Sequence, residues 1–318
     1  MVTAMSTPTP GPRAARVAAA AAVALALTTA ATGCAAFGGD RSGIVVTTNI
    51  LGDATRAIVG DEAEVTVLMG PNADPHSFGI SAPQAAALES AELVVYNGLG
   101  LEEGVLRNVE AAAEAGTPVL EVGAGVDPID YTDGDTAGTP DPHFWTDPVR
   151  MADAVDLVAD EVVERVSGVD ADRVRDNADA YRAEVEALHT DAEEAFGALP
   201  DDRRRLVTNH HVFGYLAQRY DFEVVGAVIP SGTTLASPSS ADLESLASAV
   251  ADSGVPAVFA DSSQPDRLAQ VMAEEAGVDI EVVPLFTESL TAEGEGAATY
   301  LEMTAANTEA IAGALSAD

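Results

Sequence analysis

Hydrophobic residues occur in short, nearly continuous runs along most of this chain, and each run is followed by a longer segment with helical periodicity. The runs are rich in β-branched residues, which is typical of strands buried on both faces of a sheet. Strands are expected at 44–48, 64–69, 93–96, 118–122, 205–208, 223–228, 257–260 and 280–283. Helices are expected at 53–59, 83–91, 102–115, 213–219, 241–253, 265–276 and 297–315. This alternation predicts an α/β fold with two parallel-sheet lobes.

The segment between the two sets of strands is almost entirely helical and strongly charged. Residues 170–198 have the pattern of one long helix, which at 1.5 Å per residue would exceed about 40 Å. We expect it to join the lobes as a rigid spine. The expected organisation is a signal peptide at 1–33, a tether at 34–43, an N-terminal α/β lobe at 44–168, a linking helix at 169–198 and a C-terminal α/β lobe at 199–318.

The N-terminus has the pattern of an export signal. Arg13 and Arg16 precede an alanine-rich apolar stretch, 17–31, that is short for a membrane span. The small residues that follow end in Cys34, which resembles a bacterial lipobox, although Ala31 stands where leucine is usual. We therefore expect an exported protein on the outer face of the cytoplasmic membrane, lipid-anchored through Cys34. The alternative is an ordinary cleaved signal with an incidental cysteine.

Composition limits the partners and the redox chemistry. The chain has 15 basic and 52 acidic residues and a net charge of −37, and every basic residue is arginine. Such a negative field argues against nucleic acid and against electrostatic docking on anionic lipid. One cysteine excludes an internal disulfide framework. The 47% of hydrophobic residues is enough for a sizeable core.

Four of the five histidines fall in three short segments, and two of these segments share the tripeptide Asp-Pro-His. Proline restricts its own φ and that of the preceding residue, so His76 and His143 are expected on stiffened loops. His210 follows the first strand of the second lobe. Ligands of open α/β sheets bind beside loops at the carboxyl ends of strands. We therefore expect His76, His143 and His210 to bind a transition metal in the cleft between the lobes.

A closed tetrahedral site needs a fourth ligand. Glu288, directly after the last expected strand, is the best candidate, and Asp261 or a water molecule is the alternative. Three imidazoles and one carboxylate suit Zn²⁺, whereas Mn²⁺ prefers more oxygen. His189 lies in mid-helix and is expected to be structural. His211 should point away from the site, with a transient metal relay as the lesser alternative.

The acidic loop at 127–141 has two interpretations. It is expected to be a solvated flap, and a second metal site is the alternative. Phe144, Trp145 and Phe213 are expected to form the wall behind the histidines.

These motifs together carry a family resemblance. The lipobox, the two Asp-Pro-His tripeptides, the segment Val-Thr-Asn-His-His-Val-Phe-Gly-Tyr at 207–215 and Phe-Thr-Glu-Ser at 286–289 resemble the zinc/manganese class of ABC-transporter solute-binding proteins. The resemblance covers nearly the whole mature chain. It implies that His76, His143 and His210 are nitrogen ligands and that Glu288 stands where the family usually has aspartate. A histidine at 210, where manganese-type members tend to have glutamate, favours zinc.

The resemblance also implies partners and a mode of action. The expected function is capture of Zn²⁺ outside the cytoplasm and delivery to an ABC permease driven by its ATPase, with a zinc chaperone as a further candidate partner. A monomer without enzymatic activity is expected. A manganese-binding member of the same family is the main alternative. A zinc hydrolase is the lesser one, because the chain has no His-Glu-x-x-His pattern.

Overall fold

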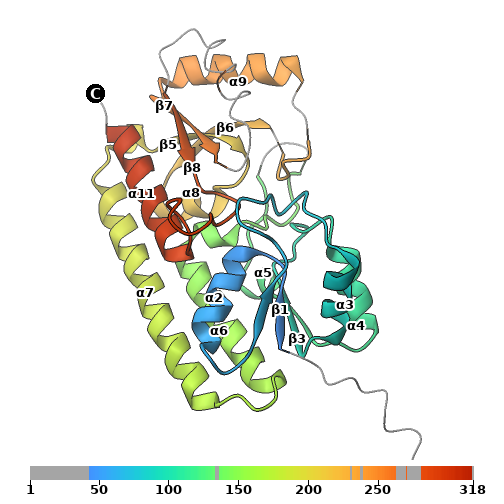
Figure 1. Ribbon diagram of the computed structural model, residues 1–318. Helices are drawn as coiled ribbons and strands as arrows, with labels where there is room; N and C mark the ends of the chain where they lie inside the picture. Colours follow the sequence, from blue (N-terminus) through green and yellow to red (C-terminus); the bar gives the residue numbers. More distant parts are fainter. Residues whose placement is uncertain are drawn as a thin grey trace, which may run out of the picture. The chain divides into compact units, whose positions relative to one another are not determined.

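The first set of hydrophobic runs forms a parallel four-stranded sheet (Figure 1). The computed structural model describes residues 43–132, 136–229, 231–236, 239–262, 270 and 281–316. In the order β2-β1-β3-β4, the strands are Val65–Val67, Ile44–Val46, Leu93–Tyr96 and Val119–Glu121. The central strands β1 and β3 are buried almost throughout, as their β-branched sequences predict. The helices that follow these strands are α2 (Asn49–Val59), α3 (Ala82–Ser90), α4 (Leu106–Glu114) and the short α5 (Val122–Gly125).

The second set forms another parallel four-stranded sheet, in the order β6-β5-β7-β8. Its strands, in that order, are Glu223–Ile229, Arg205–His210, Ala257–Asp261 and Glu281–Leu285. Its helices are α8 (Gly214–Tyr220), α9 (Ser240–Ser253) and α11 (Tyr300–Ser316). The prediction of two parallel-sheet α/β lobes is confirmed.

Two long helices, α6 (Pro148–Arg165) and α7 (Ala171–Gly197), occupy the segment between the sheets. The side chain of Asp170 caps α7 by accepting hydrogen bonds from two main-chain N–H groups of its first turn. The first part of α7 packs into the core of the first lobe through Val174 and Val185, and its end packs into that of the second through Phe196. The long helix therefore connects the two cores, as the sequence predicts.

Helix α11 also contributes to both cores and lies beside α7 (Figure 1). Tyr300 and Met303 belong to the core of the first lobe, whereas Ile311 and Leu315 belong to that of the second. Leu290, in the loop before α11, also packs into the first core. The chain therefore returns to the first lobe after β8, and the loop that carries Glu288 contacts both halves.

Helices α2 and α4 begin at other residues than expected, each for its own reason. The expected helix at 102–115 begins only at Leu106. Glu102 is instead buried, and its carboxylate accepts hydrogen bonds from Thr47 Oγ1 and the main-chain N–H groups of Asn97 and Gly98. Helix α2 begins at Asn49, four residues before the expected start, since its apolar face extends to Ile50 and Leu51.

Several sequence predictions fall outside the described residues. They are the signal peptide, the lipidated Cys34 with nearly all of its tether, and most of the expected helix at 265–276. Within the described part of the chain, none of the helices combines the length and apolarity that a membrane crossing requires.

Candidate metal centre

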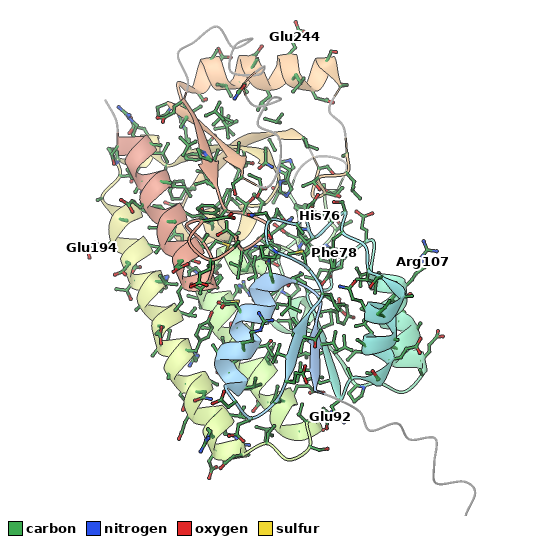
Figure 2. The ribbon with its side chains drawn as sticks, viewed as in Figure 1. His76, Phe78, Glu92, Arg107, Glu194 and Glu244 are labelled. Carbon is green, nitrogen blue, oxygen red and sulfur yellow. The ribbon has the colours of Figure 1, made fainter. Side chains whose placement is uncertain are left out.

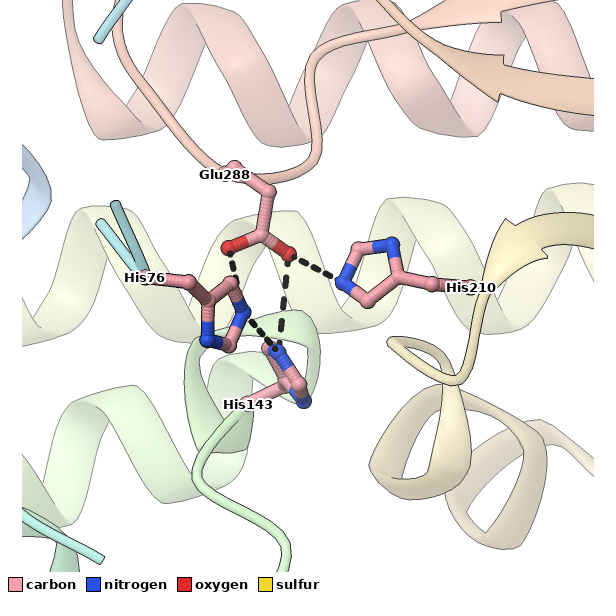
Figure 3. Close-up of side chains that lie close together, drawn as sticks. All are labelled: His76, His143, His210 and Glu288. Carbon is pink, nitrogen blue, oxygen red and sulfur yellow. Dashed lines mark hydrogen bonds and ion pairs between the residues drawn. The ribbon is translucent and has the colours of Figure 1, made fainter. Parts of the chain in front are cut away.

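His76, His143, His210 and Glu288 come together between the two sheets (Figure 3). His76 and His143 lie on loops of the first lobe, His210 ends β5, and Glu288 follows β8. All four are at most 1% exposed. In Figure 2, His76 lies in the interior whereas Glu194 and Glu244 project from the surface. The four side chains are thus enclosed by protein rather than lining an open cleft.

The facing atoms have the spacing of a metal-ligand set. Glu288 Oε1 lies 3.0 Å from His210 Nε2 and 3.5 Å from His143 Nε2, and Glu288 Oε2 lies 3.6 Å from His76 Nε2. The Nε2 atoms of His76 and His143 are 3.4 Å apart. Zinc ligands at about 2.0–2.1 Å in a tetrahedron lie about 3.3–3.4 Å from one another. The donor atoms therefore already surround a space that fits a cation of this kind.

His143 is oriented by the aspartate of its own Asp-Pro-His tripeptide. Asp141 Oδ1 accepts hydrogen bonds from the main-chain N–H of His143 at 2.9 Å and from its Nδ1 at 2.7 Å. A proton on Nδ1 leaves the Nε2 lone pair directed at the other three ligands. Gly214 is required nearby, since a Cβ atom there would lie 2.6 Å from Asp141 Oδ2.

The first tripeptide uses its aspartate differently. Asp74 accepts a hydrogen bond from the main-chain N–H of His76 at 2.9 Å, one from Ser77 Oγ at 3.0 Å and one from Thr234 Oγ1 of the second lobe at 2.6 Å. These bonds shape the loop and connect it to the opposite lobe. The same sequence motif therefore holds His143 by both its ring and its main chain, and His76 by its main chain.

Asp261 lies behind the Glu288 loop and not within the cluster. Its Oδ2 accepts hydrogen bonds from the main-chain N–H groups of Thr287 and Glu288, each at 3.2 Å, and from Thr287 Oγ1. Of the two carboxylates considered as a fourth ligand, the structure thus brings Glu288 to the histidines and gives Asp261 the role of fixing its loop.

Burial and mutual attraction govern the charges of the cluster. Burial lowers the pKa of His76 to about 4, against the opposing attraction of Glu288. Burial also disfavours charge on His143, but the carboxylates of Glu288 and Asp141 outweigh it and raise the pKa of that ring. Despite its burial, Glu288 has a pKa lowered to about 2, because the three histidines stabilise its anion. The cluster thus holds a buried carboxylate ready to neutralise a cation.

Other candidate residues have different surroundings. His189 Nδ1 lies 3.2 Å from the hydroxyl of Tyr220, a structural contact on α7 as expected. His211 lies outside the four-residue cluster. Its side chain is half-buried, and its ring centroid lies 6.4 Å from that of Tyr131. The Tyr131 hydroxyl lies 3.2 Å from His143 Nδ1. Sequence reasoning missed this contribution of the acidic loop, although an aromatic residue among aspartates and glycines could have indicated a buried anchor.

Of the three aromatic residues expected behind the histidines, Trp145 lies against His143 and also connects the lobes. The ring centroids of Trp145 and His143 are 5.3 Å apart. The Nε1 of Trp145 donates a hydrogen bond to the carbonyl of Thr287 at 2.8 Å. An ion pair also joins the two lobes close to this segment. Arg219 Nε of the second lobe lies 3.0 and 2.9 Å from the two carboxylate oxygens of the buried Asp147. The segment that carries His143 is therefore held from both lobes.

Comparison with known proteins agrees with this fold. Residues 44–314 match the family described as "Zinc-uptake complex component A periplasmic". The chain belongs to this family. Members are solute-binding components of transporters, which confirms that the chain is not an enzyme.

Characterised relatives cover most of the chain. It is 28% identical over 275 residues to the manganese-binding lipoprotein MntA of Halalkalibacterium halodurans, covering 86% of this chain and 88% of the relative. It is 29% identical over 293 residues to the zinc-binding protein TroA of Treponema pallidum, covering 90% and 93%. The solved structure of the periplasmic zinc-binding protein TroA from T. pallidum superposes with a TM-score of 0.79 at 26% identity, over 86% of this chain and 99% of that one.

Proposed function

We propose that this protein captures Zn²⁺ outside the cytoplasm with His76, His143, His210 and Glu288 and delivers it to an ABC permease driven by its ATPase. The observation that carries the proposal is the enclosed cluster itself. Buried carboxylates and imidazoles without partners are costly. Among the described residues, both Glu288 oxygens and the Nε2 of His210 are buried without a hydrogen-bond partner. A bound cation satisfies all of these groups together.

Donor chemistry supports zinc over manganese. Three imidazole nitrogens and one carboxylate form the kind of N-rich, four-ligand set that Zn²⁺ prefers, and the donor spacing matches a tetrahedron. Mn²⁺ favours more oxygen donors and more ligands. A relative named for zinc and another named for manganese both resemble the chain, so manganese is the alternative cargo.

The cellular setting follows from the same family. Relatives include metal ABC transporter substrate-binding lipoproteins, such as FimA of Streptococcus parasanguinis. We infer that this chain is anchored through a lipid on Cys34 at the outer face of the membrane and acts as a monomer. A zinc chaperone that loads the site is a further candidate partner.

Titration of the metal-stripped protein tests the proposal. Zn²⁺ and Mn²⁺ are added in competition with a chromogenic chelator, and stoichiometry and affinity are read for each. We expect one tightly bound zinc and much weaker manganese. Tight manganese with weak zinc would favour the alternative cargo, and no tight metal would contradict the function.

A matched pair of variants locates the site. His143→Ala should remove most of the zinc affinity, because it deletes a ligand. His189→Ala should leave affinity unchanged, since this histidine contacts Tyr220 and not the cluster. Equal losses in the two variants would contradict the assignment.

A further inference from the structure

Two asparagine side chains hold the main chain on either side of Glu288. Asn49, the first residue of α2, accepts a hydrogen bond from the Leu290 N–H at 3.0 Å and donates one to the Leu290 carbonyl at 3.3 Å. Asn307, in α11, accepts from the Phe286 N–H at 2.9 Å and donates to the Phe286 carbonyl at 2.8 Å. We call these two contacts the asparagine clamps. Each side-chain amide pairs with both polar groups of one residue, as a neighbouring strand would.

The clamps are placed symmetrically in the sequence. Phe286 and Leu290 are each two residues from Glu288, one before it and one after it. The clamped residues frame a short segment that contains the carboxylate ligand. The two clamps come from two different helices: α2 belongs to the first lobe, and α11 packs against β8.

Hydrogen bonds between the clamps complete the restraint. Asp261 accepts from the N–H groups of Thr287 and Glu288, and Asn49 Nδ2 also donates to Ser289 Oγ at 2.8 Å. Thr287 and Ser289 are at most 4% exposed. Main-chain hydrogen bonds therefore hold Phe286, Thr287, Glu288 and Leu290, and Ser289 is held by its side chain.

The carboxylate itself has no such main-chain support, and its oxygens face the three imidazoles at 3.0 to 3.6 Å. Neither of its oxygens has a hydrogen-bond partner among the described residues. Its position relative to the three imidazoles therefore depends on its main chain and on packing. Glutamate has one rotatable bond more than aspartate, so a mobile main chain would disperse the carboxylate over several positions and lower the affinity for a cation.

We propose that Asn49 and Asn307 are positioning residues for Glu288: the clamps fix the main chain around it and thereby set the affinity and lifetime of the bound metal. The proposal rests on the metal-binding function above. Neither asparagine belongs to the four-residue cluster, so each would act on the metal only through the Glu288 loop. Loss of one clamp removes two or more hydrogen bonds of ordinary strength. A tenfold weaker affinity, about 1.4 kcal/mol, corresponds to a part of this loss being expressed in binding.

A double-mutant cycle separates positioning from general stability. Asn49→Ala and Asn307→Ala are made in the wild-type chain and in a Glu288→Ala chain, which keeps all three histidines. Zinc affinity is measured by chelator competition, and zinc release by stopped flow into excess chelator. Asn177→Ala is the matched control, since Asn177 Nδ2 donates to the Ile58 carbonyl at 3.1 Å, between α7 and α2.

In the wild-type chain, we expect each clamp variant to bind zinc about tenfold more weakly and to release it faster. In the Glu288→Ala chain the same substitutions should have no further effect, because no carboxylate remains to be positioned. Asn177→Ala should leave zinc affinity and release unchanged in both chains. Thermal unfolding of the metal-free proteins shows that each variant is folded. Asn49→Asp and Asn307→Asp, which keep one acceptor, replace any alanine variant that fails to fold.

Two results would overturn the proposal. One is wild-type zinc affinity in both clamp variants. The other is an equal loss with and without Glu288, which would show a general effect on the fold. A wild-type protein that binds no metal would instead refute the proposed function itself, and the positioning role with it.

Discussion

Replacing Asp141 by asparagine tests how strongly the carboxylate behind His143 contributes to zinc binding. Asp141 Oδ1 accepts both the main-chain N–H and the ring N–H of His143, at 2.9 and 2.7 Å. Since both donors face the same oxygen, an asparagine side chain can keep its carbonyl in that place. The substitution therefore removes the negative charge and preserves the hydrogen-bond geometry.

The expected loss follows from the difference between a charged and a neutral acceptor. A hydrogen bond to a charged group contributes about 1.5–3 kcal/mol and a neutral one about 0.5–1.5 kcal/mol. A difference of about 1–1.5 kcal/mol weakens zinc binding roughly five- to fifteenfold. Asp141→Ala, which removes the acceptor as well, should cost about 10- to 100-fold.

The assay is zinc competition with a chelator of known affinity at fixed pH and ionic strength. Asp74→Asn is the matched control, because Asp74 occupies the same place in the other tripeptide and bonds the main chain of His76 at 2.9 Å. Its loss should be smaller than that of Asp141→Asn. Wild-type affinity in Asp141→Asn, or a larger loss in Asp74→Asn, would refute the view that the charge behind the ring strengthens this ligand.

Three further predictions concern pH and stability. Zinc affinity should fall on acidification from above about pH 6.5, since the pKa of His143 is raised and only the neutral ring binds metal. Chelator competition between pH 8 and 5.5 checks this prediction. An affinity that does not change with pH would contradict it. Glu102→Ala should lower the free energy of unfolding of the metal-free protein by about 2–4 kcal/mol in urea denaturation, because buried hydrogen-bond donors lose their acceptor. An unchanged urea midpoint would be inconsistent with Glu102 as the acceptor that stabilises this loop. Arg219→Ala should lower the thermal unfolding midpoint, because it leaves the buried Asp147 without its main partner. Arg175→Ala, at an exposed ion pair 4.0 Å apart, should leave the midpoint unchanged. Equal shifts would argue against a difference between buried and exposed ion pairs.

The fold could be predicted because its local patterns and its tertiary environment agree. Buried β-branched runs form both sheets, and the capped, charged segment after Asp170 forms α7. Helix starts were predicted less well where a side chain bonds main-chain groups outside the expected helix. Glu102 lies in the expected first turn of α4, but it bonds the N–H groups of Asn97 and Gly98 instead.

The cluster of His76, His143, His210 and Glu288 could be proposed from the sequence. Two of the histidines follow Asp-Pro on loops, and the other two residues lie at or just after the end of a strand. Its supporting contacts could not. Asn49 and Leu290 are separated by 241 positions, and no local pattern connects them. Such partners become apparent only when the fold brings α2, α11 and the Glu288 loop together.

The enclosure of the cluster determines what a membrane partner can recognise. With its four ligands at most 1% exposed, a cation held there presents no charge or coordination position at the protein surface. A permease therefore cannot contact a bound cation while the cluster stays enclosed. Any signal that metal is bound must therefore reach such a partner through the groups at the protein surface.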